Sequence, residues 1–480
     1  MSQQPSECDV RLESKSFSTD AIAVIRLDGW ERISSLFRFE VEIVVKDKAG
    51  LDLTKVAGAS VTLVFEKRGL PVRRVHGMVA SAIDRMNLDV EYRVYRLEIV
   101  PHAHVLSLID SIDVHVAETV PDVIQAKLAS VGLTETSQLR LSATYETREF
   151  IVQYKESDLA LVSRLAEHLG VSFFFEQDEE NDRIVFTDHE GGFKRHEERL
   201  EFHKRGERLS VFELEARREI VPAAYLVNDY NYRTPLVDLS ATVELASGFA
   251  GGVFEYGGHF RTPEGAKALA NVRAQERQAG ELVYRATSDV PEISAGHRFT
   301  LEGHPHLEHS DLLVTEVTHK GAWAGFFSES AGEPYTNTFK AIPAERTFRP
   351  ARTTPRPRIA GVVTGLIDPG GVAGSNEIPY IDDQGRYLVR LLFDGGASKE
   401  RRASHAIRMA QPHAGPGYGH HFPLRPDVEV IVVFVEGDPD RPIIAGAVPN
   451  PLTPSPVTSA ESTVNRIRTQ SGIVIELHDR

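Results

Sequence analysis

The chain has 480 residues, 41% of them hydrophobic, and at about 150 residues per domain this length predicts about three soluble globular domains. It carries 69 acidic and 54 basic residues, a net charge of -15 at pH 7. Because non-specific binding to nucleic acids and anionic membranes relies on clustered lysine and arginine, this balance argues against a general phosphate-binding or membrane-coating surface.

The N-terminal residues do not resemble a secretory signal peptide. MSQQPSECDV lacks the apolar stretch of such a peptide, and no apolar run in the chain approaches the ~18 residues that span a bilayer. Cys8 is the only cysteine, which excludes an intrachain disulfide and a four-cysteine zinc site and favours folding in a reducing compartment. If the protein leaves the cell, we expect a route other than the signal peptide.

The first hundred residues predict β-strands. Apolar and charged residues alternate in FRFEVEIVVK, 37–46, and period two is typical of a half-buried strand. SVTLVF, 60–65, and EYRVYRLEIV, 91–100, continue the pattern, and several such strands between turns favour a barrel or a sandwich. The residues predicted on the apolar face of the first strand are Phe37, Phe39, Val41, Ile43 and Val45.

Helical signals follow. In 118–132, Thr119 is a suitable N-cap before an apolar periodic run. The segment 151–177 predicts a strand, a helix that Ser157 caps and Gly170 ends, and a second strand. It continues as a predicted hairpin, VSFFFE–QDEENDR–IVF.

Strands resume from about residue 213. One helix interrupts them over 262–280, with Thr262 as its N-cap. HRFTLEG, 297–303, and DLLVTEVTHKG, 311–321, are again predicted strands. A β-rich segment therefore recurs after an α/β segment.

RTFRPARTTPRPR, 346–358, is a predicted linker. Its prolines cannot donate ladder hydrogen bonds, and its five arginines, without an acidic residue, should repel one another and keep the chain open. Beyond it, five short strands in about ninety residues predict a small closed barrel of the OB type. These segments are IAGVVTGLI, GRYLVRLLFD, HAIRMAQP, VEVIVVFVEG and RPIIAGAV.

The last segment, 449–480, is first rich in proline, serine and threonine and then alternates in polarity, with Ile473, Ile475 and Leu477 on one side. A lone strand of this kind has nothing within its own chain against which to bury its apolar side. We therefore expect it to pair with copies of itself as the start of a stalk that continues past Arg480. Ile473, Ile475 and Leu477 are the predicted contacts between chains.

Two acidic clusters have the composition of a catalytic site. EGDPDRP, 436–442, lies between two predicted strands, so Asp438, Asp440 and the neighbouring glycine and prolines predict a hairpin connection. QDEENDR, 177–183, contains four carboxylates of the kind that acid–base catalysis pairs in a cleft. Its place at a hairpin tip instead predicts a solvated turn with ordinary pKa values.

Histidine clusters are the candidates for a metal site. HPHLEH, 304–309, offers three imidazoles, with Glu308 or His319 as a further ligand, but its position between strands predicts a loop. RHEERLEFH, 195–203, fails the zinc-protease pattern because Leu200 stands four residues after His196. The remaining clusters, also predicted to be loops, are GGVAG at 370–374 and His413, His420 and His421. No catalytic, cofactor or metal site is predicted.

Several segments, in order along the chain, carry a resemblance to a known family. DDQGRYLVRLLFD (382–394), AIRMAQPHAGPGYGHHFPLRPDVEVIVVF (406–434) and EGDPDRPIIAGAVPNP resemble its OB domain. FIVQYKESDLALVSRLAEHLGVSFFFE (150–176) resembles the strand–helix–strand signature of its hub, and SAGHRFTLEGHPH (294–306) with LLVTEVTHKG resembles its second barrel. From about residue 8 to 480, the chain resembles the VgrG spike proteins of bacterial type VI secretion systems, which are similar to the hub and spike of contractile phage tails.

The resemblance implies a mainly β protein with an α/β portion. It would contain two barrel-like hub domains, an OB-fold barrel and the start of a trimeric β-helical stalk. The implied boundaries are a base over 1–345, a linker over 346–356, the OB domain over 357–448 and the stalk from 449 to 480. Within the base, barrel 1 covers about 8–105, the α/β segment about 106–212 and barrel 2 about 213–345.

The resemblance also implies a function without catalysis or cofactor. The chain would form the homotrimeric tip of a contractile machine and join an Hcp-like hexameric tube ring to a membrane-puncturing stalk. Further implied partners are a PAAR-type tip protein, baseplate proteins and effector cargo, with no nucleic acid. Assembly would take place in the bacterial cytoplasm and delivery would follow from contraction. Pro449 directly follows the last OB strand, so no lysozyme domain is inserted there.

Other functions remain open at the level of sequence. His413 and Tyr418 stand where many VgrG proteins have tryptophan, and the first OB loop is long, so a related extracellular injection system or phage-like particle is an alternative. A peptidoglycan-degrading hub enzyme or a peptidase would need a cleft with perturbed acidic or metal-binding groups. An OB-type binder of nucleic acid or sugar would need aromatic residues on a basic groove, whereas Tyr380, Tyr387 and Tyr418 lack a strong basic track.

Overall fold

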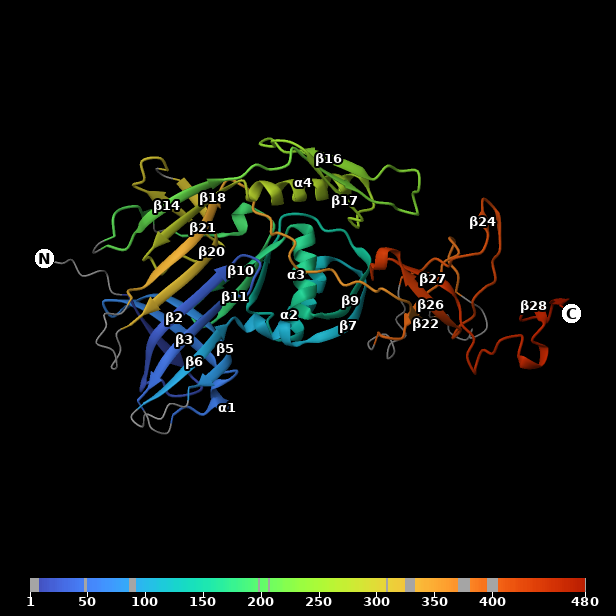
Figure 1. The fold of residues 1–480 in the computed structure, drawn as a ribbon, viewed down its shortest axis with the longest axis horizontal. Helices are drawn as coiled ribbons and strands as arrows, with labels where there is room; N and C mark the ends of the chain where they lie inside the picture. The colour runs from blue at the N-terminus through green and yellow to red at the C-terminus, as the bar shows by residue number, and fades with distance from the viewer. Residues whose placement is uncertain are drawn as a thin grey trace. The chain divides into compact units, whose positions relative to one another are not determined.

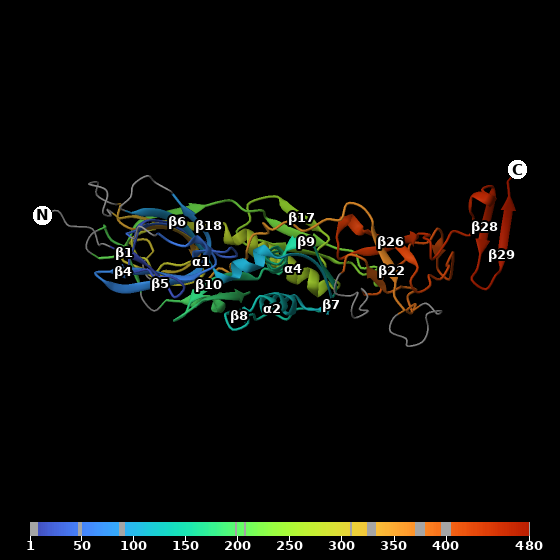
Figure 2. The ribbon, with the colours of Figure 1, turned by 90° about the horizontal axis from the view of Figure 1, so that it is seen from below.

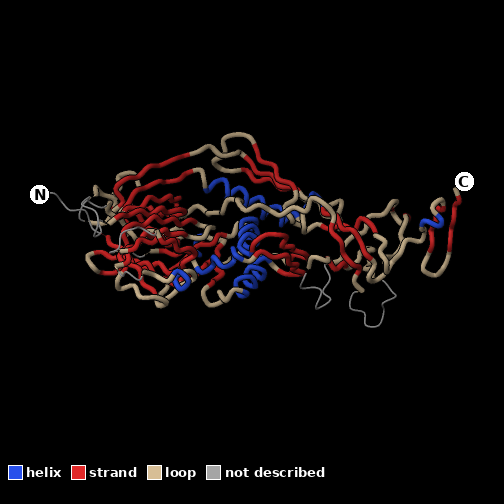
Figure 3. The backbone as a smooth tube through the Cα atoms, turned by 60° about the horizontal axis from the view of Figure 1, so that its bottom comes forward, coloured by secondary structure: helices blue, strands red, loops and turns tan. Residues whose placement is uncertain are grey.

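The computed structural model describes residues 8–46, 50–85, 92–196, 199–205, 208–307, 310–323, 333–369, 380–394 and 405–479. Strands predominate over helices among them (Figure 3). The chain divides into two compact units, each assembled from separate segments. Unit 1 comprises Met1–Ile109, Ile124–Thr144 and Val162–Pro355, and unit 2 comprises Asp110–Val123, Tyr145–Leu161 and Arg356–Arg480. None of the helices in the described ranges combines the length and apolar character that a membrane span requires.

Unit 1 is built on one 13-stranded sheet whose main path runs β1-β4-β5-β6-β3-β2-β20-β21-β18-β14 (Figure 1). Antiparallel pairing of β2 with β20 joins two β-rich halves into this single sheet. The first half contains β1 (Cys8–Ser14), β2 (Ile22–Arg32), β3 (Arg38–Val45), β4 (Ser60–Lys67), β5 (Leu70–Asp84) and β6 (Arg93–Val100). The second contains β14 (Val211–Arg218), β18 (Leu282–Ser288), β19 (His297–Glu302), β20 (Ser310–Ala322) and β21 (Thr336–Pro343). The short strands β12 (Lys194–Arg195) and β13 (Leu200–Glu201) pair with β19.

Alternation of polarity in β3 produces the predicted two-faced strand. All five residues of the predicted apolar face are buried, among them Phe39, Val41 and Ile43, which are fully inaccessible. On the other face, Glu42 accepts hydrogen bonds from Arg96 of the neighbouring β6 and from Arg85, which directly follows β5. Burial therefore fixes the register, because a slip of one residue would exchange the two faces.

Three predicted helices form with the predicted caps. Helix α2 (Val120–Ser130) is preceded by Thr119, whose hydroxyl accepts from the Asp122 N–H at 3.3 Å. Helix α3 (Asp158–Leu169) is capped by Ser157 and followed by Gly170, which adopts φ 71°. Helix α4 (Pro263–Ala279) is capped by Thr262, whose hydroxyl accepts from the Gly265 N–H at 3.1 Å. These caps satisfy backbone N–H groups that the first helical turn leaves without a partner.

Two small sheets complete unit 1. Strands β10 (Ser172–Gln177) and β11 (Asp182–Thr187) form the predicted hairpin, and β8 (Ser137–Arg140) adds in parallel to β11. The second sheet, in the order β16-β15-β17, shares an apolar cluster with α4. Its strands are β15 (Ala224–Asn228), β16 (Ser240–Glu244) and β17 (Gly252–Tyr256). The remaining elements are the short helix α1 (Leu53–Val56) and the 3-10 turns η1 (His102–Leu108) and η2 (Glu190–Gly192).

In the described part of the OB segment of unit 2, a four-stranded sheet and a closing segment stand where the sequence predicts five strands. The sheet runs β23-β22-β26-β27. The segment 405–410 makes only isolated bridges, in which Ile407 exchanges hydrogen bonds with Tyr387, and Ile444 bonds to Arg408 and Ala410. Because these bonds connect the two ends of the sheet, this segment closes the barrel. The strands are β22 (Val363–Ile367), β23 (Val389–Leu391), β26 (Glu429–Phe434) and β27 (Pro442–Ala447), and β24 (Ala414–Gly415) pairs with β25 (Tyr418–Gly419).

Unit 2 also contains an antiparallel pair of strands from the α/β segment of the sequence, with α2 and β8 between the two strands along the chain. Strands β7 (Asp110–Glu118) and β9 (Arg148–Ser157) pair antiparallel. Phe150 and Val152 of β9 belong to the same buried cluster as the OB residues Val389, Val432 and Ile444. A strand far away in sequence therefore supplies part of the OB core.

The chain ends in a two-stranded hairpin rather than the predicted lone strand. Strands β28 (Val464–Arg468) and β29 (Val474–His478) pair antiparallel and lie side by side in Figure 2. The connection turns at Gly472, which adopts φ 92°, and Thr469 donates its N–H to the Ile473 carbonyl at 2.9 Å. The prediction missed β28 because Arg466 and Arg468 interrupt its apolar pattern. The last turns of unit 2 are η3 (Val435–Gly437) and η4 (Ser459–Glu461).

Candidate functional site

The terminal hairpin brings the three predicted contact residues to one face. Ile473 directly precedes β29, and Ile475 and Leu477 lie within it, with exposed fractions of 65%, 57% and 66%. The register pairs Ile475 with Ile467 of β28 and Leu477 with Asn465. Directly paired residues share a face, so Ile467 extends the same apolar surface. We call Ile467, Ile473, Ile475 and Leu477 the apolar face of the hairpin.

The opposite face of the hairpin, which we call the polar face, carries charged and polar side chains together with Val464 and Val474, and Arg466 pairs within the chain. Arg466 donates to Glu476 at 2.6 Å and to Glu461 at 2.6 Å, and it also reaches the Pro456 carbonyl at 2.7 Å. The hydrogen bond from Arg466 lowers the pKa of Glu461. These ion pairs are solvent-exposed, where water and salt screen the attraction between the charges. The polar face thus completes its contacts within the chain, whereas the apolar face does not.

The predicted linker is bound to the rest of unit 1 by ion pairs and hydrogen bonds, whereas charge repulsion among its arginines predicted an open chain. Arg346 pairs with Glu281 at 3.0 Å, and Arg349 donates to Gln275 and to the backbone carbonyls of Gly170 and Asp188. These partners lie elsewhere in the fold, which explains why the composition of the linker alone gave the wrong expectation. Glu167 of α3 adds hydrogen bonds from Thr353 and Thr354.

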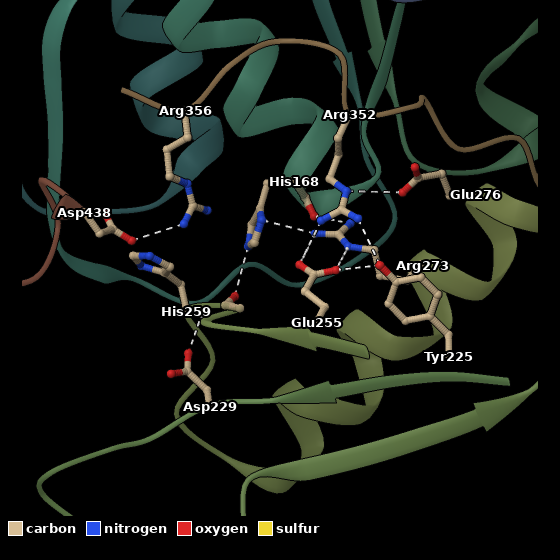
Figure 4. Close-up of polar contacts among 11 residues, drawn as sticks. His168, Tyr225, Asp229, Glu255, His259, Arg273, Glu276, Arg352, Arg356 and Asp438 are labelled. Atoms are coloured by element: carbon tan, nitrogen blue, oxygen red, sulfur yellow. Dashed lines mark hydrogen bonds and ion pairs between the residues drawn. The ribbon is translucent and has the colours of Figure 1, made fainter. Parts of the chain in front are cut away.

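Arg352 enters a buried polar network in unit 1, shown in Figure 4. Its guanidinium pairs with Glu255 at 2.8 Å and Glu276 at 3.5 Å and donates to the Tyr225 hydroxyl at 3.0 Å. Glu255 also pairs with Arg273 of α4, whose side chain is fully buried. Burial raises the pKa of Glu255, but Arg273 and Arg352 outweigh it, and the net pKa is lowered.

The same network reaches α3. Arg273 donates to the backbone carbonyl of His168 at 3.0 Å and lies 3.2 Å from its Nδ1, while His168 Nε2 lies 3.1 Å from the Gly258 carbonyl. Because that carbonyl can only accept, Nε2 carries the proton and Nδ1 accepts from Arg273. The network therefore joins α3, α4, the small sheet and the linker by bonds that satisfy a buried arginine.

A second buried network connects the two halves of the large sheet. Arg73 of β5 contacts Glu31 of β2 and donates to the backbone carbonyls of Pro291 and Ile293. His319 of β20 lies 2.8 Å from the same Glu31 carboxylate and 2.7 Å from the Tyr335 hydroxyl. Burial opposes ionisation of Glu31, but Arg73 and His319 outweigh it and lower its pKa to about 2. His319, fully buried, has its pKa lowered by desolvation.

The acidic clusters behave as predicted at EGDPDRP and partly differently at QDEENDR. Residues 436–442 connect β26 to β27, with Asp438 pairing to Arg356 at 3.1 Å and Asp440 accepting from the Val152 N–H at 2.7 Å. In the second cluster, Asp178 accepts N–H groups of its own turn. Asp182, however, is buried and contacts His102. The prediction of a wholly solvated turn is therefore wrong for this residue, because β11 begins at it and carries it inward.

The histidines of the predicted clusters make separate contacts in the structure. His304 packs its ring on Phe202 in the loop between β19 and β20, whereas His319 is committed to Glu31 and Tyr335. His196 lies 3.0 Å from His297. His413 lies against Tyr418, and His421 contacts Tyr387 and Gln411. GGVAG at 370–374, Glu308 and His309 lie outside the described residues.

Family models match most of the chain. Residues 30–324 match the model described as phage tail baseplate hub (GPD), and residues 376–448 match that of the type VI secretion system/phage-baseplate injector OB domain. The first match alone covers more than half of the chain. The two matched regions are the β-rich hub and the barrel that the hydrogen bonds close.

Curated relatives and a solved structure agree with these models. The chain is 30% identical over 460 residues to the type VI secretion system spike protein VgrG4b of Pseudomonas aeruginosa, covering 91% of this chain and 55% of the relative. It is 29% identical over 450 residues to VgrG5 of the same organism, covering 88% and 55%. This chain therefore spans about half the length of these relatives.

The fold is similar to that of the E. coli c3393 protein, described as a component of the type VI secretion system with structural similarity to the T4 tail proteins gp27 and gp5. The TM-score is 0.67 at 22% identity, with 91% of this chain and 100% of the other covered.

Proposed function

Since this chain belongs to the phage tail baseplate hub (GPD) family and is similar over most of its length to VgrG spike proteins, we propose that it is the homotrimeric tip of a type VI secretion apparatus. The family relationship makes it a spike or hub protein of a contractile injection system. The formation of a trimer, the stalk and the partner proteins are what we propose beyond the family relationship. The apolar face of the terminal hairpin is the observation that carries the proposal.

The apolar face supports association between copies on energetic grounds. A buried isoleucine or leucine side chain contributes about 1.5–3 kcal/mol relative to its exposed state. The four side chains of the face are 45–66% exposed, so burying what remains in water would contribute about 3–7 kcal/mol per chain. The ion pairs of the polar face do not oppose this burial, because they lie on the other face of the hairpin and form within one chain. An isolated two-stranded hairpin is marginal in water, and a shared core between three copies would stabilise it.

We assign each successive segment of the chain a separate role in the spike. The base at 1–345 would meet an Hcp-like hexameric ring, the OB domain at 357–448 would follow the 346–356 linker, and 449–480 would begin the β-helical stalk. A PAAR-type tip, baseplate proteins and effector cargo are the proposed further partners. We propose assembly in the bacterial cytoplasm and delivery by contraction, which fits a mechanical spike role that itself requires no enzymatic step.

Light scattering of the full chain after size exclusion tests the trimer. Ile475→Asp with Leu477→Asp would place two carboxylates in the shared core, so this variant should become monomeric while the unmodified chain is trimeric. Val474→Asp with His478→Asp adds the same two groups to the opposite face of β29 and should remain trimeric. A folded, monomeric unmodified chain, or equal loss of the trimer in both variants, would contradict the proposal.

A further inference from the structure

Three side chains from distant segments of unit 1 lie in the order hydroxyl, imidazole, carboxylate. Ser60 begins β4, His102 begins η1 and Asp182 begins β11. Ser60 Oγ is 3.0 Å from His102 Nε2, and the other ring nitrogen, Nδ1, contacts Asp182 Oδ1. This is the arrangement by which a base, itself oriented by a third group, activates a nucleophile.

The contacts determine which ring nitrogen of His102 carries the proton. An ionised carboxylate can only accept hydrogen bonds, so Nδ1 donates to Asp182, and Nε2 of the neutral ring is left to accept from the Ser60 hydroxyl. Asp182 also accepts the His102 backbone N–H, through Oδ2 at 3.0 Å. One carboxylate therefore holds both the backbone and the ring of His102 and orients the imidazole toward Ser60.

Burial decreases from the carboxylate to the hydroxyl. The Asp182 side chain is 2% exposed, the His102 side chain is 30% exposed, and Ser60 is exposed at the start of its strand. A reagent in solution can thus reach Ser60 Oγ. The Asp182 carboxylate is shielded from water, and this shielding strengthens its interaction with the His102 ring. The hydrogen bond to Asp182 raises the pKa of His102 against the effect of burial, which makes the ring a better proton acceptor.

Two neighbouring pairs resemble this one but do not place a carboxylate on the second ring nitrogen. Thr62 Oγ1 lies 2.9 Å from His76 Nδ1, and Nε2 of that ring faces the Asp178 backbone carbonyl at 3.2 Å. Ser107 Oγ lies 3.4 Å from His104 Nδ1. Burial lowers the pKa of His76. Thr62 and Ser107 are therefore internal controls for any reactivity of Ser60.

We propose that Ser60 is a nucleophile that His102 and Asp182 activate toward small acyl esters, a hydrolytic centre on unit 1. Ser60 Oγ attacks the ester carbonyl carbon while its proton passes to His102 Nε2. The carbon–oxygen bond to the alcohol then breaks, and His102 returns the proton to the departing alcohol. Water hydrolyses the acyl-serine by the same route, releasing the carboxylic acid and regenerating Ser60, so that no oxidant or further reactant is needed.

The centre is independent of the proposed spike function. Ser60, His102 and Asp182 all belong to unit 1, and the terminal hairpin belongs to unit 2. A failure to trimerise would leave the proposal intact, and an unreactive Ser60 would leave the spike function intact.

Labelling of the full chain with a fluorophosphonate, mapped by mass spectrometry, tests the proposal. We expect an adduct on Ser60 and none on Thr62 or Ser107, and a labelling rate that rises with pH as His102 loses its proton. Hydrolysis of p-nitrophenyl acetate should show the same pH profile. A folded chain without an adduct on Ser60 would overturn the assignment.

Variants show whether Ser60 is labelled because His102 and Asp182 activate it or only because its hydroxyl is exposed to solvent. Ser60→Ala should abolish the adduct, and His102→Gln and Asp182→Asn should each slow labelling at least tenfold, while Ser107→Ala should label as the unmodified chain does. Equal labelling of Ser60 in His102→Gln would refute activation. Thermal melting of each variant checks that it is folded.

Ser60→Cys keeps the test decisive if those variants unfold, because it leaves His102 and Asp182 in place. Alkylation of its thiol by iodoacetamide should then be faster below pH 7 than that of an ordinary cysteine with a pKa near 8.5. An ordinary pH dependence would overturn the proposal.

Discussion

At the scale of single residues, the buried charges of the Glu31 network in unit 1 are tolerated because each of them has more than one partner. Glu31 is held by Arg73 and His319, and Arg73 also donates to two backbone carbonyls. Removing one member of such a set leaves the others desolvated and unpaired, which costs more than the pair contributes when intact. Cys8 is buried without forming a disulfide, and burial raises the pKa of its thiol to about 12.

Glu31→Gln should destabilise unit 1 strongly. The change leaves the buried Arg73 without its counter-charge, for which we expect a loss of about 3–5 kcal/mol. Denaturant unfolding followed by tryptophan fluorescence measures it. The control Glu40→Gln removes the carboxylate that pairs with the exposed Arg38, and should cost less than about 1 kcal/mol. Similar losses in both variants would contradict the role of the buried network.

Acidification should destabilise unit 1 between about pH 6.5 and 4. Burial lowers the pKa of His196 to about 4, and it also lowers the pKa values of His297 and His319. The unfolded chain therefore binds more protons in this window, so stability rises with pH and is lost as pH falls. His102, whose pKa is raised, acts in the opposite direction and reduces the net effect.

His196→Gln tests this assignment. Loss of one titrating group should reduce the slope of unfolding free energy against pH by up to about 1.4 kcal/mol per pH unit. Melting curves at half-unit steps from pH 4 to 7.5 measure the slope. An unchanged slope would show that His196 is already charged in the folded state.

At the scale of elements, helices and strands form where their own sequence directs them, but connections take their conformation from distant partners. The linker arginines show this most clearly, since Arg346, Arg349 and Arg352 each bind acceptors on or near α3 and α4. Charge repulsion within the linker is outweighed because opposite charges and carbonyls lie at hydrogen-bonding distance.

Arg352→Met should loosen the linker without unfolding α4. Loss of its bonds to Glu255, Glu276 and Tyr225 should speed amide hydrogen exchange over 350–355 roughly tenfold, equivalent to ~1.4 kcal/mol. Hydrogen exchange with mass spectrometry measures the effect. Arg358→Met is the matched control, because the described structure gives Arg358 no ion pair. Equal rates of amide exchange over 350–355 in both variants would show that the contacts of Arg352 do not hold the linker in place.

At the scale of the whole molecule, the compact units do not follow the order of the sequence. The antiparallel pair of β7 and β9 belongs to unit 2, where Phe150 and Val152 lie in the OB core and Asp440 accepts the Val152 N–H. The OB barrel therefore depends on a segment about two hundred residues earlier in the chain.

A fragment of residues 356–480 should accordingly be less stable than unit 2 in the full chain. Without β9 its core exposes the surface that Phe150 and Val152 cover, so it should bind a dye for exposed apolar surface and melt at a lower temperature. Calorimetry and dye fluorescence measure these effects, with the full chain as the reference. A fragment that melts as unit 2 does and binds no dye would show that β9 is not part of the core.

The sequence by itself determined the elements and the family. Period-two strands such as β3, the caps Thr119, Ser157 and Thr262, the hairpin at 436–442 and the alternation at 473–477 are local patterns, readable because backbone geometry repeats every two or 3.6 residues. Only the tertiary structure decided that the linker is fastened, that 405–410 closes the barrel, that β28 pairs with β29 and that Ser60, His102 and Asp182 meet. Those features depend on contacts between segments far apart in the chain. Such contacts do not produce a periodic pattern in the local sequence, so local patterns do not predict them.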